Sequence, residues 1–110
     1  MASTRDQRIR RYARRKALVD DWKLSSGCTQ CERPIEDAHL LEFDHLPEYD
    51  KLMDVSHALY QGWEVLVAEA AKCEIVCYWC HKERTKVRRL EAKVRKLQLE
   101  VRELTRKGQK

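Results

Sequence analysis

Apolar side chains recur at roughly helical spacing in the first quarter of the chain. Arg-rich polar positions separate them between Asp6 and Leu24, and a period of about 3.6 residues predicts a helix with one apolar face. Ser25, Ser26 and Gly27 are expected to end this helix, because Ser and Gly favour turns. The apolar positions are Ile9, Tyr12, Ala13, Val19 and Trp22.

Two strand patterns and two helix patterns follow. Alternation of apolar and polar residues predicts a strand over His39–His45, on which Asp44 and His45 point to opposite faces. Glu74–Cys77 is a second β-favouring run. Between them we expect a short helix from Asp54 or Ser56, as the cap, to Tyr60, and a longer helix from Gly62. The apolar stripe of that longer helix consists of Trp63, Leu66, Val67 and Ala70.

From His81 to Gly108 no residue breaks a helix. Apolar residues there alternate in gaps of three and four, which is the a/d pattern of a coiled coil, with Val at every a and Leu at every d. This combination favours a parallel two-stranded coil, in which Lys86 of one chain faces Glu91 of the other. The pattern extends for roughly 27 Å, which is marginal for an isolated coil, and packing on the protein's own domain is the alternative. The six positions are Val87, Leu90, Val94, Leu97, Val101 and Leu104.

Four of the five cysteines form two Cys-x-x-Cys pairs, Cys28/Cys31 and Cys77/Cys80. A two-residue gap lets a tight turn aim both sulfurs at one ion, so the pairs predict one tetrahedral zinc site. Two disulfides, or a redox pair, are the alternative. The Arg-rich start with no apolar signal segment favours a reducing compartment. We expect Cys73 to be a buried small hydrophobe.

Charge is segregated along the chain, whose formal net charge is +5. Residues 1–24 carry +5, residues 25–81 carry −8 and residues 82–110 carry +8. Basic arms suit a polyanion, because Lys and Arg gain affinity by releasing counterions from phosphates. Solvated helix faces are the alternative. The candidate phosphate contacts are Arg8, Arg10, Arg11, Arg14, Arg15 and Lys16.

Asp44, His45 and His81 are the candidate chemical residues. Hydrolysis of a phosphodiester needs a base to deprotonate water and positive charge on the developing oxyanion. His45 can be that base, because imidazole is neutral over much of the working pH range. A divalent ion such as magnesium between Asp44 and His81 supplies the charge. A surface turn for Asp44 and His45, and a fifth candidate zinc ligand for His81, are the alternatives.

Together these segments resemble the zinc-bearing HNH endonucleases, which have a ββα-metal fold and are common in bacteria and their phages. The resemblance extends from about Arg5 to Thr85. It is carried by Tyr12-Ala-Arg-Arg-Lys-Ala-Leu-Val-Asp20, Gly27-Cys-Thr-Gln-Cys31, Leu41-Glu-Phe-Asp-His45, Asp54-Val-Ser56, Ala71-Lys-Cys-Glu-Ile-Val-Cys77 and Cys80-His-Lys-Glu-Arg-Thr85.

The resemblance implies a metal-dependent DNA endonuclease or nickase. His45 looks like the general base, and Asp44 and His81 look like ligands of a catalytic magnesium or manganese ion. Duplex DNA is the expected substrate, because no aromatic-rich sheet face suggests single-stranded RNA recognition. The structural zinc ligands that it implies are Cys28, Cys31, Cys77 and Cys80.

One position departs from the family pattern. Family members have Asn one residue before the final cysteine, where it holds the backbone near the base, and this chain has Trp79. Trp offers one N–H donor and no acceptor, so it cannot replace an amide. We expect impaired catalysis or a relocated helper, for which His39 and His57 are candidates, although each is otherwise an ordinary surface or core histidine.

Two other functions remain open. One is a catalytically inactive, dimeric, zinc-stabilised module that binds nucleic acid. The other is an adaptor whose heptad helix binds a different chain.

The expected fold class is α+β. A basic N-terminal helix (residues 1–24) precedes a zinc-stabilised ββα-metal domain (25–85) and a C-terminal heptad helix (86–110). The expected partners are duplex DNA and a second copy of the chain, with no membrane. The expected location is the cytoplasm of a bacterium or of a phage-infected host cell.

Overall fold

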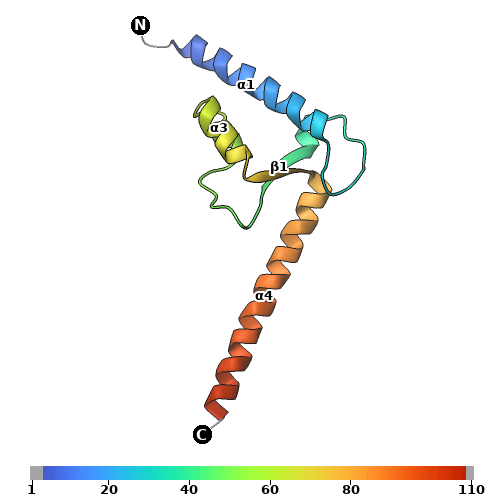
Figure 1. Ribbon diagram of the computed structural model, residues 1–110, viewed down its shortest axis with the longest axis vertical. Coiled ribbons are helices and arrows are strands. Elements are labelled where there is room, and N and C mark those ends of the chain that lie inside the picture. The colour runs from blue at the N-terminus through green and yellow to red at the C-terminus, as the bar shows by residue number, and fades with distance from the viewer. Residues whose placement is uncertain (1–3, 109–110) are drawn as a thin grey trace. The chain divides into compact units, whose positions relative to one another are not determined.

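The computed structural model describes residues 4–108, so residues 1–3 and 109–110, at the outer ends of the two expected terminal segments, lie outside the described part. The chain combines helices with a two-stranded sheet and is therefore α+β, as predicted (Figure 1). It divides into two compact units, 1–78 and 79–110. The elements are α1 (Arg5–Ser26), a 3₁₀ turn η1 (Ala38–Leu40), β1 (Leu41–His45), α2 (Val55–Ala58), α3 (Trp63–Ala70), β2 (Cys73–Cys77) and α4 (Tyr78–Gly108).

Helix α1 has a defined start and stop. The Thr4 hydroxyl accepts from the Gln7 backbone N–H at 3.2 Å, and the Gln7 side chain accepts from the Thr4 N–H at 3.0 Å. This reciprocal capping box satisfies two backbone donors that have no partner within the helix. At the other end Gly27 adopts a φ of 66°, which L side chains rarely adopt, and its N–H donates to the Lys23 carbonyl. The helix therefore ends at the predicted Ser-Ser-Gly sequence.

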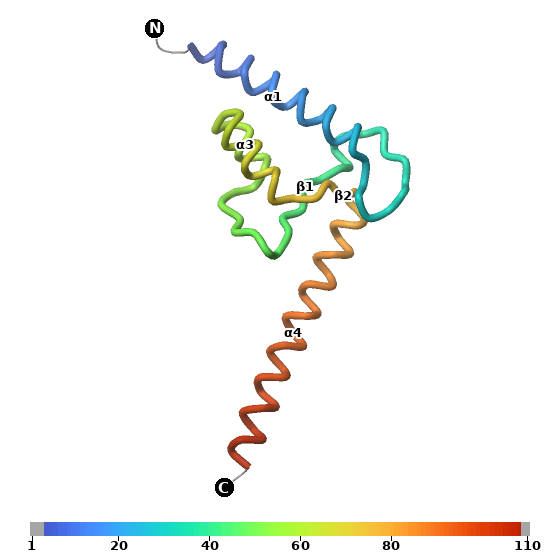
Figure 2. The backbone as a smooth tube through the Cα atoms, in the orientation of Figure 1, coloured from blue at the N-terminus to red at the C-terminus, as the bar shows by residue number. Residues whose placement is uncertain are grey.

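The two strands pair in an antiparallel sheet (Figure 2). Strand β1 begins two residues later than the sequence predicts, because His39 lies in η1, where the Asp37 carboxylate accepts its N–H at 2.9 Å. The register pairs Leu41 with Cys77 and His45 with Cys73. Cys77 and His45 therefore lie at opposite ends of the sheet, about 13 Å apart along the strands at about 3.3 Å per residue.

One cluster of apolar side chains forms the core of the first unit. It joins Val19 of α1 to α2 and α3, with Phe43 of β1 packed against it. The Phe43 ring also meets Trp22 edge to face, with centroids 5.3 Å apart. The remaining buried members are Val55, Ala58, Leu59, Leu66 and Ala70.

The predictions for the two short helices were partly wrong. Helix α2 ends at Ala58 rather than Tyr60, and Asp54 precedes it without a side-chain capping bond. Helix α3 turns Leu66 and Ala70 inward as predicted, but Trp63 and Val67 are exposed. The buried face of α3 consists of Leu66, Ala70 and Glu69, so the helix is rotated about its axis relative to the prediction. The reason is the set of polar contacts that Glu69 makes, described below.

No helix among residues 4–108 combines the length and the apolar character needed to cross a bilayer.

Candidate functional site

The first cysteine pair is attached to strand β2 by a residue inside its own turn. The backbone N–H and the hydroxyl of Thr29 both donate to the Ile75 carbonyl, at 2.9 and 3.0 Å. Because Thr29 lies between Cys28 and Cys31, these two bonds hold that turn beside the strand that ends in Cys77. Residues 46 positions apart in the sequence are thereby brought together.

The four cysteines of the two pairs form a cluster that fits a zinc ion. Their sulfur atoms all lie within 4.8 Å of one another, and those of Cys31 and Cys77 are 3.7 Å apart. Tetrahedral zinc with bonds of about 2.3 Å places its sulfur ligands about 3.8 Å apart. None of the four is in a disulfide, so the structure does not contain the two disulfides of the alternative. In the described part of the chain, no other group of three or more His, Cys, Asp or Glu side chains converges in this way.

The electrostatics of Cys28 favour metal binding. Burial raises the pKa of this thiol, but the backbone N–H groups of Cys31, Cys77 and Gln30 stabilise the thiolate and lower the pKa to about 6. The Cys31 and Gln30 nitrogens each lie 3.4 Å from the Cys28 sulfur. A thiolate is the form that binds zinc. The backbone N–H groups of the Cys28–Cys31 turn therefore favour the form of Cys28 that can bind the ion.

Cys73 has the opposite character. Burial, together with the nearby carboxylates of Glu69 and Asp44, raises the pKa of its thiol to about 11. Its sulfur donates to the Glu69 carbonyl at 3.5 Å. Cys73 is partly buried, packs against the core as a neutral thiol and lies outside the cysteine cluster, so it is less buried than predicted but behaves as a small hydrophobe rather than a ligand.

His45, the predicted base, is held by a buried carboxylate. Its Nε2 lies 2.9 Å from Oε1 of Glu69, and the side chains of His45 and Glu69 are 13% and 2% exposed. Strand β1 supplies the histidine at its last residue, and helix α3 supplies the glutamate one residue before its end. The imidazole thus has one nitrogen fixed by the protein while part of the ring remains accessible.

The Glu69 carboxylate is satisfied on both oxygens. Oε1 accepts the backbone N–H of Leu52 at 3.0 Å, and Oε2 pairs with the Lys72 ammonium at 3.0 Å. Lys72 also donates to the Asp50 carbonyl at 2.8 Å. Burial raises the pKa of Glu69, but its bonds to Lys72, His45 and the backbone outweigh burial and lower the pKa to about 2. Glu69 is therefore ionised at any pH at which the protein would work.

Glu69 was missed by the sequence interpretation, which named His39 and His57 as the candidate helpers of His45. Both of those histidines are exposed, and the contact to His45 comes from α3 instead. A signal was present, because Glu69 follows Leu66 by three residues and adjoins Ala70 on the buried face. A charged residue on the buried face of a helix almost always has a partner.

The other two candidate chemical residues lie on different elements. Asp44 is 2% exposed in β1, and no buried side-chain nitrogen or oxygen among residues 4–108 lacks a hydrogen-bond partner. His81 is the fourth residue of α4 and belongs to the second unit. Trp79, at the position where the family has Asn, is 47% exposed on the same helix.

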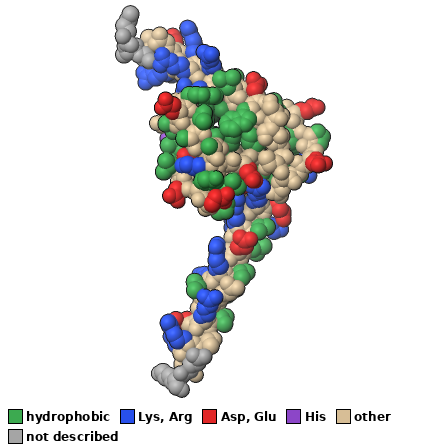
Figure 3. All heavy atoms as spheres, viewed as in Figure 1, with side chains coloured by type: hydrophobic (Ala, Val, Ile, Leu, Met, Phe, Trp, Pro, Cys, Tyr) green, Lys and Arg blue, Asp and Glu red, His purple; other side chains and the backbone are tan. Residues whose placement is uncertain are grey.

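The basic side chains of α1 are largely exposed, and Figure 3 shows Lys and Arg gathered over this helix. Arg15 and Lys16 of the predicted set make hydrogen bonds within the protein. Arg15 donates from Nε to the Leu59 carbonyl at 2.7 Å, and Lys16 pairs with Asp20 at 3.2 Å. The remaining predicted contacts, Arg8, Arg10, Arg11 and Arg14, are exposed.

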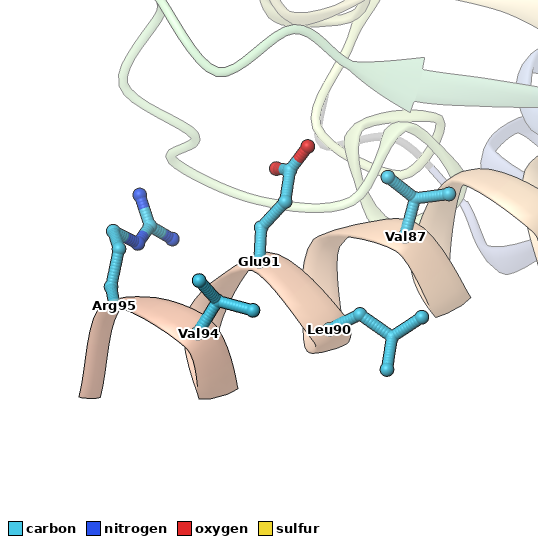
Figure 4. A pocket seen from close by; sticks show the side chains of 5 residues that line it. All are labelled: Val87, Leu90, Glu91, Val94 and Arg95. Carbon is cyan, nitrogen blue, oxygen red and sulfur yellow. The ribbon is translucent and has the colours of Figure 1, made fainter. Parts of the chain in front are cut away.

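The predicted heptad stripe lies on one continuous helix. Its six apolar side chains are between 43% and 69% exposed. Figure 4 shows Val87, Leu90 and Val94 along α4, with Glu91 and Arg95 projecting to the same side of the helix. Because the second unit consists of this single helix, it contains no second element to cover the stripe.

Comparison of the chain with protein-family models, with curated proteins and with solved structures finds no match in any of the three. Any functional assignment therefore depends on the geometry of the site.

Proposed function

We propose that the protein is a metal-dependent endonuclease or nickase of the HNH type, which hydrolyses phosphodiester bonds in duplex DNA. The observation that carries the proposal is the pair formed by His45 and Glu69. A buried, ionised carboxylate against a partly accessible imidazole is an arrangement that orients a general base. The antiparallel pair of β1 and β2, with α2 and α3 between the two strands in the sequence and α4 directly after β2, and the cysteine cluster support the same family.

The pair also determines which imidazole nitrogen is basic. An ionised carboxylate has no proton to donate, so Nε2 of His45 must donate its proton to Glu69. In neutral imidazole the other nitrogen, Nδ1, then carries the lone pair. His45 therefore takes a proton from water at Nδ1, while Glu69 keeps the ring in one tautomer and stabilises the imidazolium that forms.

Asp44 is the proposed ligand of the catalytic ion in the first unit, and His81, in the second unit, is a ligand predicted from the sequence alone. The Asp44 carboxylate is a hard oxygen donor of the kind that magnesium and manganese prefer. Asp44 precedes His45 on a strand, so the two side chains leave the backbone toward opposite faces and serve different roles. A bound divalent ion supplies positive charge for the developing oxyanion and the leaving oxygen.

The test of this function is the conversion of supercoiled plasmid by the purified zinc-loaded chain in magnesium or manganese. Nicked or linear product that depends on the added metal supports a nuclease. Nicked product alone indicates cleavage of one strand, and linear product at low conversion indicates paired cleavage. Retarded plasmid with no product in either metal contradicts the proposal.

A zinc-stabilised, dimeric nucleic-acid-binding module is the second candidate function. The observation that favours it is Trp79, an exposed aromatic ring where an amide is expected. This module would bind DNA in a salt-sensitive manner through the basic helix and would not cut it. The plasmid assay separates the two functions directly.

Replacing Glu69 by Gln is expected to lower kcat about 10- to 100-fold with little change in KM. A loss of this size is usual when a carboxylate that orients a functional histidine is removed. Gln keeps the shape and can still accept the Leu52 N–H, but it removes the charge that stabilises protonated His45. The matched control is Glu64→Gln, the same change on an exposed residue of α3. Steady-state cleavage kinetics that are equal for the two variants would contradict the role of Glu69.

We propose that the heptad stripe of α4 binds a second copy of the chain. Valine at a and leucine at d are the residues that parallel two-stranded coils use. In that register Lys86 of one chain faces Glu91 of its partner, and the next such pairs are Lys93 with Gln98 and Glu100 with Thr105. One pair is attractive and neither of the others is repulsive, so flanking charge does not oppose the dimer.

Replacing Leu97 by Asn is expected to weaken dimerisation at least about tenfold, because a polar side chain enters the apolar seam. The matched control is Leu99→Asn, since Leu99 is equally exposed but lies at an outward f position. Sedimentation equilibrium measures both variants against the parent chain of 13.1 kDa. A parent chain that is strictly monomeric would contradict self-association and would favour a different chain as the partner of the stripe.

A further inference from the structure

A hollow of about 320 Å³ lies between α1 and the turn that leads into α3. Three arginines, Arg8, Arg11 and Arg15, line it together with two tyrosines, Tyr12 and Tyr60. No Asp or Glu is among the described residues that line it. Three guanidinium groups around one concavity repel one another, so the hollow is suited to an anion.

The helix period explains why these arginines meet there. Residues 8, 11, 12 and 15 lie within an arc of about 100° around α1. The same face buries Val19 two turns further along, where the body of the unit covers it. Closer to the N-terminus, Tyr60 stacks on Tyr12 of this face. Beyond Tyr60, the arginines of the same face border the open hollow. Arg10 and Arg14 leave α1 outside this arc and do not line the hollow.

The floor of the hollow is held by contacts within the protein. The Tyr12 and Tyr60 rings stack with centroids 4.4 Å apart and planes 17° from parallel. The Arg15 guanidinium is anchored through Nε to the Leu59 carbonyl at 2.7 Å. A hydrogen bond with Tyr60, together with burial, raises the pKa of Tyr12, so this phenol stays uncharged. A ligand would therefore meet a floor that is already formed.

We propose that this hollow binds the phosphate backbone of a nucleic acid, with Arg8 and Arg11 as the phosphate contacts and Arg15 with the tyrosine pair as the floor. Planar guanidinium groups bind phosphate through two parallel N–H bonds, which gives arginine its advantage at such sites. The proposal builds on the proposed function and restricts the nucleic-acid contacts of α1 to one face of the helix.

The test compares two double variants that remove the same charge from the same helix. Both are made in the full chain carrying His45→Ala, so that binding is measured without cleavage. Arg8→Gln/Arg11→Gln removes two positive charges that line the hollow. Arg10→Gln/Arg14→Gln removes two positive charges from exposed arginines outside the hollow. Fluorescence anisotropy of a labelled 16-base-pair duplex is titrated at several salt concentrations, and far-UV circular dichroism checks folding.

Each phosphate contact contributes about 0.9 to the slope of log affinity against log salt. The Arg8/Arg11 variant is therefore expected to lower the slope by about 2, and the Arg10/Arg14 variant by much less. A third variant, Arg8→Lys/Arg11→Lys, keeps both charges and is expected to keep most of the slope. Equal losses in the two Gln variants would overturn the proposal, as would a parent chain that binds no duplex.

The outcomes for this hollow and for the nuclease function are separable. Plasmid cleavage by the chain with His45 intact, combined with equal losses in the two Gln variants, overturns only the hollow as the binding face. Face-specific binding with no cleavage in either metal supports the hollow and overturns only the nuclease.

Discussion

Replacing His45 by Ala is expected to lower the rate of plasmid cleavage about 10²- to 10⁴-fold, the usual contribution of a general base. The fold should persist, because Glu69 keeps its bonds to Lys72 and to the Leu52 N–H when the imidazole is gone. Gel quantification of nicked and linear plasmid measures the loss. Atomic absorption for zinc and circular dichroism establish that the variant is folded and loaded.

The matched control is His57→Ala, the same substitution at an exposed histidine of α2. The His57 ring lies 3.4 Å from the Gln61 side chain. This control should cleave as the parent chain does. If His45→Ala continues to nick plasmid at the rate of His57→Ala, another group activates the water and the proposed mechanism is wrong.

Loss of the metal is expected to unfold the first unit. Apparent zinc-binding free energies in small structural sites are about 10 to 16 kcal/mol at neutral pH, which is comparable with the whole stability of a domain, about 5 to 15 kcal/mol. Cys77→Ser, in the fully buried member of the cluster, should abolish stoichiometric zinc binding and the cooperative thermal transition. Zinc analysis and thermal circular dichroism measure these two losses.

Strand β2 offers its own control. Cys73→Ser changes the other cysteine of the same strand, which lies outside the cluster, and should leave one zinc ion bound per chain. Some loss of thermal stability is expected in this control, because Cys73 packs against the core. Full zinc occupancy in Cys77→Ser, or its loss in Cys73→Ser, would show that the ion binds elsewhere.

Local signals predicted the parts of the site that depend on local geometry. The spacing of Cys28 and Cys31 sets a turn whose own N–H groups point at the sulfur, and this turn is present in the structure. Alternation of residue types located β1 to within two residues, and helical period located α1. These features are short-range, so a stretch of a few residues contains all the information that they need.

The partner of His45 could not be predicted in the same way. The contact with Glu69 joins residues 24 positions apart, and it exists only because α3 is rotated to turn a carboxylate inward. Helical periodicity in the sequence favoured Trp63 and Val67 for that face, since apolar residues are the usual core positions. Polar contacts to Lys72 and to the loop before α2 determined the rotation instead, and no window of the sequence contains all of these groups.

Zinc binding by both cysteine pairs would also have a topological consequence. When zinc joins the two pairs, it closes a loop that contains β1, α2, α3 and most of β2, and therefore both His45 and Glu69. A protease that cuts once inside this loop leaves two fragments that are still tied together by the ion. Such a nicked chain remains one particle in solution until a chelator removes the metal, after which the fragments can separate.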